Sequence, residues 1–152
     1  MSLRRRFDPI RSTILLAALL AAAPVSAADI QVRGALDPFP HDMSTRDNVV
    51  GIGMVEATLA GDRLTVSGRF TDLSSPATGA QLRMGAAMGV PGPKIGELIV
   101  TKANAGEISG TVKLSPAAIA ALKNNALYVE IDSAKAPEGN SWAWLEAQAG
   151  TS

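Results

Sequence analysis

Apolar and polar residues alternate in short runs along most of this chain. A period of two places successive side chains on opposite faces of a β-strand, so each run predicts a strand with one buried and one solvated face. The clearest example is Arg63 to Phe70, where Leu64, Val66 and Phe70 share one face. Comparable runs lie at 29–39, 49–59, 80–84, 95–100, 107–114, 127–132 and 141–147. We therefore predict seven or eight short antiparallel strands.

The segments between these runs carry turn and helix signals. Gly61-Asp62 suits a two-residue type II′ hairpin turn, and residues 85–93 form a glycine- and proline-rich loop. Ser115-Pro116 combines a good N-cap with a favoured first helical residue, and predicts a short helix that ends at Asn124-Asn125. Residues 134–140 are expected to be a loop. The pattern predicts an all-β fold, an antiparallel β-sandwich of immunoglobulin-like size with one short helix, or a small barrel.

The first 27 residues have the composition of a secretory signal peptide. Four arginines precede an apolar run at 12–23, and Val25-Ser26-Ala27 supplies a small-residue cleavage site. The apolar run is shorter than the ~20 residues that span a bilayer, so we expect no membrane span after cleavage. Arg4 to Phe7 partly matches a twin-arginine signal, which leaves the export route open. Residues 28–152 are then one domain, periplasmic or secreted.

Charge and cysteine content exclude several classes of function. The whole chain carries 14 Lys/Arg and 14 Asp/Glu, and loss of the predicted signal leaves a net charge of −3. The ten Lys and Arg of residues 28–152 are scattered singly, which argues against a nucleic-acid partner. The chain has no cysteine. Disulfides, thiolate metal sites and cysteine nucleophiles are therefore excluded.

Several motifs resemble the CHRD (chordin) domain family. They are the hairpin GDRLTVSGRFTDLSSPAT at 61–78, Gly92-Pro93 before a strand, Leu-Ser-Pro at 114–116, and Tyr128-Val129 followed by Pro137 and Gly139. The resemblance covers nearly all of residues 28–152. It implies a β-sandwich domain found in many exported bacterial proteins, with no established general catalytic activity. The animal namesake of the family binds growth factors outside the cell.

The chain departs from the family at its polar positions. Gln81 and Arg83 stand where relatives usually carry His-x-His, and Asp132-Ser133 replaces a His-Thr pair. In the closing strand, Trp142 stands where relatives usually carry an arginine and Trp144 where they carry a glutamine. A metal or polar role that those residues have in relatives therefore does not carry over to this chain.

The two tryptophans are the most informative side chains of the chain. Their spacing of two places both on one face of the last strand, on the side where Tyr128 and Glu130 are expected. We predict a binding surface made of Trp142, Trp144, Tyr128, Glu130 and Arg83. Aromatic side chains offer large contact areas at low entropic cost, and an arginine can stack on a ring or pair with a carboxylate. In the alternative, the helix or the N-terminal segment covers both indoles.

No motif predicts catalytic residues or a cofactor. His41 is the only histidine, and a surface role is favoured over a metal site with Asp42. Met84 and Met88 could be soft copper ligands, although methionine is an ordinary gap-filler in cores. The leading hypothesis is an exported non-catalytic domain that binds a protein, or a small apolar or sugar-like ligand. The alternatives are a metal-binding redox or hydrolytic domain, and a purely structural envelope protein.

Overall fold

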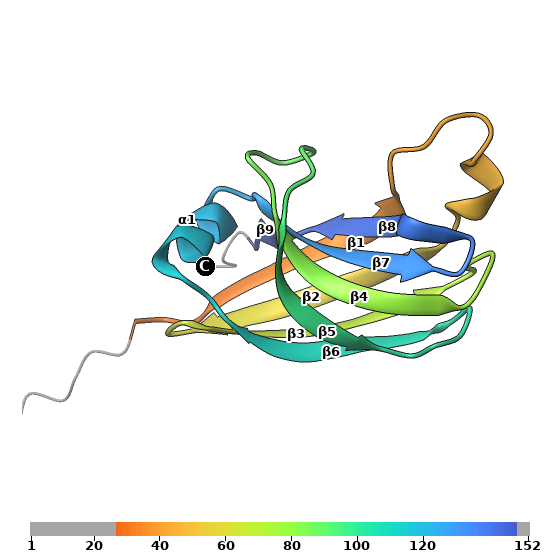
Figure 1. Cartoon of the computed structure of the whole chain (residues 1–152). Coiled ribbons are helices and arrows are strands. Elements are labelled where there is room, and N and C mark those ends of the chain that lie inside the picture. The colour runs from red at the N-terminus through yellow and green to blue at the C-terminus, as the bar shows by residue number, and fades with distance from the viewer. Residues whose placement is uncertain (1–26, 149–152) are drawn as a thin grey trace, which may run out of the picture.

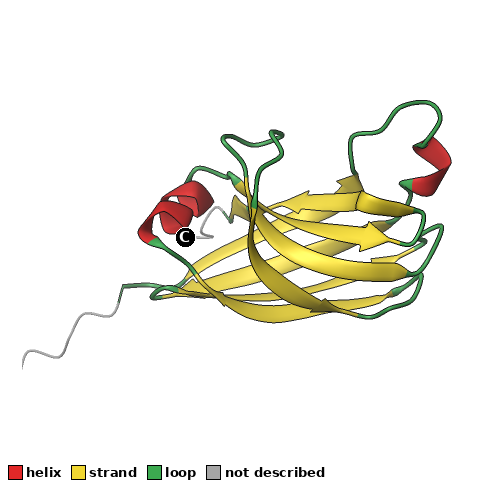
Figure 2. Ribbon diagram, in the orientation of Figure 1, coloured by secondary structure: helices red, strands yellow, loops and turns green. Residues whose placement is uncertain are grey.

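A computed structural model describes residues 27–148 as a β-barrel with a short helix at one end (Figures 1 and 2). The strands are β1 (Ile30–Pro38), β2 (Ile52–Ala60), β3 (Arg63–Thr71), β4 (Ala77–Met84), β5 (Lys94–Val100), β6 (Gly106–Lys113), β7 (Leu127–Ser133), β8 (Ala136–Trp144) and β9 (Glu146–Ala147). The helix α1 spans Pro116–Lys123, and a 3-10 turn, η1, spans Arg46–Asn48. The predicted signal peptide lies outside the described residues, apart from its last residue.

Eight antiparallel strands close into a ring in the order β1-β2-β3-β6-β5-β4-β7-β8, and β8 pairs again with β1. Closure depends on β1, which pairs with β2 along one edge at residues 30–36. Its other edge pairs with β9 at Val32 and Arg33 and with β8 at Asp37 and Pro38. Strand β5 pairs first with β4 and then, at Ile99 and Val100, with β6. The all-β antiparallel prediction with one short helix is confirmed, but the two sheets expected of a sandwich are joined into a closed barrel.

The interior of the barrel is the face that alternation predicted. Leu64, Val66, Phe70 and Leu82 are each no more than 3% exposed and belong to one hydrophobic core. Burial of a side chain of this size contributes roughly 1.5–3 kcal/mol before the entropy of folding is counted. Phe70 on β3 and Leu82 on β4 come from different halves of the ring, so one core stabilises both halves.

Helix α1 begins and ends at the residues that its capping signals indicate. The Ser115 hydroxyl accepts a hydrogen bond from the backbone N–H of Ala118 at 3.2 Å, and Pro116 is the first helical residue. Leu122, which is fully buried, joins the core. The helix therefore covers one end of the barrel (Figure 1). Within residues 27–148, no helix has the length and apolar character needed to cross a membrane.

The prediction of a loop at 134–140 is wrong, because most of that segment belongs to β8. Ser133 pairs with Ala136, so only two residues form the turn between β7 and β8. Pro137 lies at an exposed position, where the missing N–H of proline is tolerated more easily. Gly139 has φ +128°, and a Cβ there would lie 2.9 Å from the ring of Phe39. Close contact with Phe39 therefore explains why a glycine is needed at position 139. From the sequence alone, a glycine near a proline suggests a loop.

Candidate functional site

The outer face of β5, β4, β7 and β8 gathers all five predicted site residues. The strand register aligns two rows across this face. The first row is Glu97, Gln81, Glu130 and Trp142, and the second is Lys94, Arg83, Tyr128 and Trp144. Directly opposed side chains on neighbouring strands lie close enough to interact. Strand pairing therefore brings together residues that are up to 61 positions apart in the sequence, Arg83 and Trp144.

Four aromatic rings form a continuous group on this face, which we call the aromatic cluster: Phe39, Tyr128, Trp142 and Trp144. The Tyr128 and Trp144 rings lie 4.4 Å apart between centroids, and the two indoles lie 5.3 Å apart in an edge-on arrangement. Phe39, which follows β1, meets Trp142 edge-on at 4.9 Å. Such pairs add about 0.5–1.5 kcal/mol each beyond their area burial. The cluster is therefore part of the structure as well as a candidate contact surface.

The five residues differ in their access to solvent. Tyr128 is fully buried and Glu130 is 2% exposed, whereas Trp142, Trp144 and Arg83 are partly exposed. Part of the cover comes from the N-terminal side of the domain, as one alternative proposed, because Phe39 packs on Trp142. Helix α1 lies at the end of the barrel and has its contacts with β7 and β9. Tyr128 and Glu130 can therefore support a contact surface but cannot themselves touch a partner in this conformation.

A largely buried polar network lies beside the tryptophans on the same face. Glu130 Oε1 accepts a hydrogen bond from Gln81 Nε2 at 3.0 Å and forms an ion pair with Arg83 Nε at 3.1 Å. Gln81 Nε2 also donates to Asp132 Oδ2 at 2.9 Å. Burial raises the pKa of Glu130 and of Asp132, and Gln81 and Arg83 offset only part of that effect. Gln81 and Asp132 were missed as site members, although each lies two residues from a predicted one.

The loop between β4 and β5 projects from the barrel (Figure 1), and its first residue, Gly85, lies next to the Trp144 ring. Its six residues 86–91, Ala-Ala-Met-Gly-Val-Pro, are all exposed and have no polar side chain, and we call them the finger. The base of the finger is tied to the barrel. Gly92 N donates to the Tyr128 hydroxyl at 3.0 Å, and Gly92 O accepts from Arg83 Nη1 at 2.9 Å. A Cβ on Gly92 would lie only 1.8 Å from the Met84 carbonyl oxygen, so this position requires glycine.

The residues considered for a metal site have other contacts. His41 Nδ1 lies 2.9 Å from the carbonyl oxygen of Phe39. The Asp42 carboxylate accepts hydrogen bonds from Ser44 and Thr45, which lower its pKa. Met84 packs against the core, whereas Met88 lies in the finger. Within residues 27–148, no three or more His, Cys, Asp and Glu side chains come together in a group that could hold a metal ion.

Comparison with known proteins matches this chain to a family but to no individual protein. No curated protein and no solved structure matches the chain. The family model of the CHRD domain matches residues 23–140, which is most of the 152-residue chain and includes β1 to β7 with part of β8. The chain therefore belongs to the CHRD domain family.

Proposed function

We propose that this protein is a non-catalytic binding domain exported to the cell envelope, and that it binds a protein partner through Trp142, Trp144 and the finger. The observation that carries the proposal is the position of two partly exposed indoles beside an uncharged projecting loop. Clustered aromatic and apolar side chains of this kind dominate the energy of protein interfaces. Membership of the CHRD domain family also favours binding over catalysis.

In this proposal the five residues have two different roles. Trp142 and Trp144 contact the partner, while Tyr128, Glu130 and Arg83 hold the contact surface in place. Tyr128 and Arg83 are both hydrogen-bonded to Gly92 at the base of the finger. A loop that is already ordered loses less conformational entropy when a partner binds. The buried residues would thus raise affinity by preorganisation.

The hydrogen bonding of the site favours an apolar protein surface over a sugar as the ligand. A sugar needs polar side chains that are free to bond with its hydroxyl groups. The Gln81 amide instead donates to both Glu130 and Asp132, and Lys94 pairs with Glu97. The finger has no polar side chain. What the face offers to a ligand is therefore contact area, which suits an apolar cleft of a protein.

Site-specific photo-crosslinking in intact cells tests the proposed contact. A photoreactive residue at Val90, 45% exposed in the finger, should give an adduct with one envelope protein. The same residue at Asp62, exposed in the turn between β2 and β3, is the control and should give none. The adduct at Val90 should disappear when Trp142 and Trp144 are both replaced by alanine. Adducts of equal yield from both positions, or none from Val90 in the folded protein, would contradict the proposal.

Export is tested separately by the mass of the protein in the envelope fraction. Cleavage of the predicted signal gives a chain that begins at Ala28. A full-length chain retained in the cytoplasm would contradict export and would leave the binding face to be judged by the crosslinking result.

A further inference from the structure

A second apolar surface lies on the opposite side of the barrel from the aromatic cluster. Strand β3 stands across the ring from β7. On the neighbouring strand β2 and just before it, Val50, Ile52 and Met54 are 38%, 62% and 45% exposed. A solvated strand face is expected to carry polar side chains at these alternate positions. A contiguous apolar patch on an outer face is typical of an interaction site.

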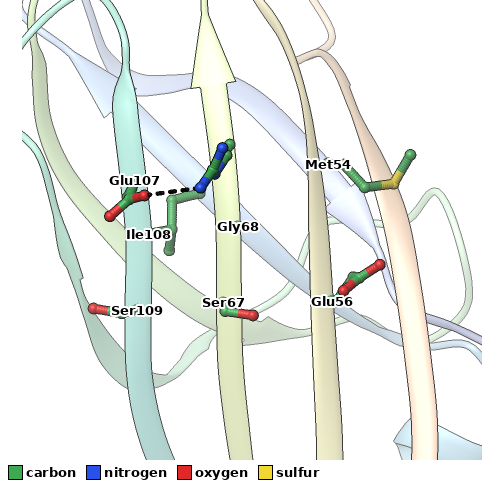
Figure 3. A pocket seen from close by; sticks show the side chains of 8 residues that line it. Met54, Glu56, Ser67, Gly68, Glu107, Ile108 and Ser109 are labelled. Atoms are coloured by element: carbon green, nitrogen blue, oxygen red, sulfur yellow. Dashed lines mark ion pairs between the residues drawn. The ribbon is translucent and has the colours of Figure 1, made fainter.

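This patch contains both a projection and a hollow. An open cavity of about 420 Å³ lies over β2, β3 and β6, with Ser67, Gly68 and Ser109 among its lining residues and Met54 and Glu56 along one side (Figure 3). A second, mostly apolar cavity of about 520 Å³ adjoins it at Met54 and Arg69 and extends to Ile52. The short outward side chains of Ser67 and Ser109 leave this space open, whereas side chains at Gly53 and Gly68 would point into the barrel. The face thus presents large exposed side chains beside a space that similar side chains could fill.

The charged residues of the patch are also balanced. Met54 is paired in register with Arg69, and Arg69 with Glu107. Arg69 Nη2 lies 3.5 Å from Glu107 Oε1, and both side chains are largely exposed, at 86% and 70% (Figure 3). One positive and one negative group therefore lie at the same level of the face. Glu56, which also lines the hollow, is opposed in register by Arg33, so the face as a whole has no net charge to repel a copy of itself.

We propose that this face, with Ile52, Met54, Arg69 and Glu107 at its centre, pairs with the same face of a second copy of the chain about a two-fold axis. A two-fold contact requires one patch that is complementary to itself. The Ile52 side chain of each copy enters the hollow of the other, and Arg69 of each copy lies opposite Glu107 of the other. The two aromatic clusters then point outward on opposite sides of the dimer, which allows two partners to bind at once.

Sedimentation velocity over a range of protein concentrations tests this proposal. The native protein should show a monomer–dimer equilibrium and nothing larger. A two-fold interface contains residue 52 twice. If Ile52→Asp lowers the affinity about tenfold at each of the two sites, the dissociation constant of the dimer should rise roughly 100-fold. Met54→Lys should have the same effect. Met43→Asp, which changes an exposed methionine in the loop between β1 and η1, is the matched control and should leave the equilibrium unchanged.

A charge exchange identifies the pairing within the dimer. Arg69→Glu alone should weaken association, and addition of Glu107→Arg should restore it. Trp142→Ala should not alter dimerisation. Failure of the dimer proposal can therefore be distinguished from failure of the proposed partner-binding face. A monomer at every concentration, an equal loss with Met43→Asp, or growth beyond a dimer would overturn the proposal.

Discussion

Two arginine–glutamate pairs on this barrel differ mainly in burial, and this difference predicts how much each contributes to stability. Arg83 and Glu130 join β4 to β7 at 3.1 Å, with side chains that are 28% and 3% exposed. Arg69 and Glu107 join β3 to β6 at 3.5 Å, with side chains that are 86% and 70% exposed. Removal of either glutamate leaves an arginine without its partner. Only in the first pair does that arginine remain partly shielded from water.

The expected cost of Glu130→Ala is about 3 kcal/mol, the lower end of the range for breaking a buried ion pair. The lower end applies because Arg83 is partly exposed and keeps its hydrogen bond to Gly92 O. The Gln81 amide also loses one of its two acceptors. Glu107→Ala should cost less than about 1 kcal/mol, since an exposed pair is screened by water and salt. Glu130→Gln should cost less than Glu130→Ala, because it keeps the packing and removes the buried charge.

Urea unfolding at neutral pH, followed by tryptophan fluorescence, measures these differences. The fluorophores Trp142 and Trp144 lie on the same face as Glu130, so their emission reports the loss of this part of the barrel. The free energy of unfolding is obtained by linear extrapolation, at a dilution where the protein is monomeric. Equal losses for Glu130→Ala and Glu107→Ala would refute the argument, because burial would then have no part in the contribution of the pair.

Three further predictions follow from the same structure. Phe70→Ala should lower the free energy of unfolding by about 3–5 kcal/mol as a large core truncation, whereas Arg69→Ala on the outer face should cost less than about 0.5 kcal/mol; a similar loss for both would show that the strand register is wrong. The raised pKa values of Glu130 and Asp132 mean that the folded state binds more protons than the unfolded state, so their contribution is present below the unfolded pKa values and is lost as pH rises through the folded ones. The unfolding temperature should therefore decline as pH rises through that window, and the decline should be weaker in Glu130→Gln. An identical pH profile for the variant would contradict this assignment. Tyr128→Phe removes a hydroxyl that holds the base of the finger, and should cost about 1–3 kcal/mol and increase proteolysis within residues 86–91; an unchanged cleavage rate would show that the hydroxyl does not order the loop.

The sequence by itself determined most of the strands, the interior face of the barrel and the helix, because each depends on neighbouring residues. The alternation of Leu64, Val66 and Phe70 places them on the inner face of the sheet, whichever strands pair with this one. The cap at Ser115 and the proline that follows mark the start of α1 in the same local way. The common face of Trp142 and Trp144 also follows from spacing alone.

Only the tertiary structure decided how the sheet closes and which side chains of the site remain exposed. Closure requires β1 to pair with β2 along one edge and with β8 and β9 along the other, and its own residues specify neither partner. Alternation likewise assigns Tyr128 and Glu130 to the outer face but does not say what lies above them. Tyr128 is hydrogen-bonded to Gly92, 36 residues away in the chain, and Phe39 packs on Trp142 from a still more distant segment. Burial on an outer face depends on contacts between segments that are distant in the sequence, and local periodicity carries no information about such contacts.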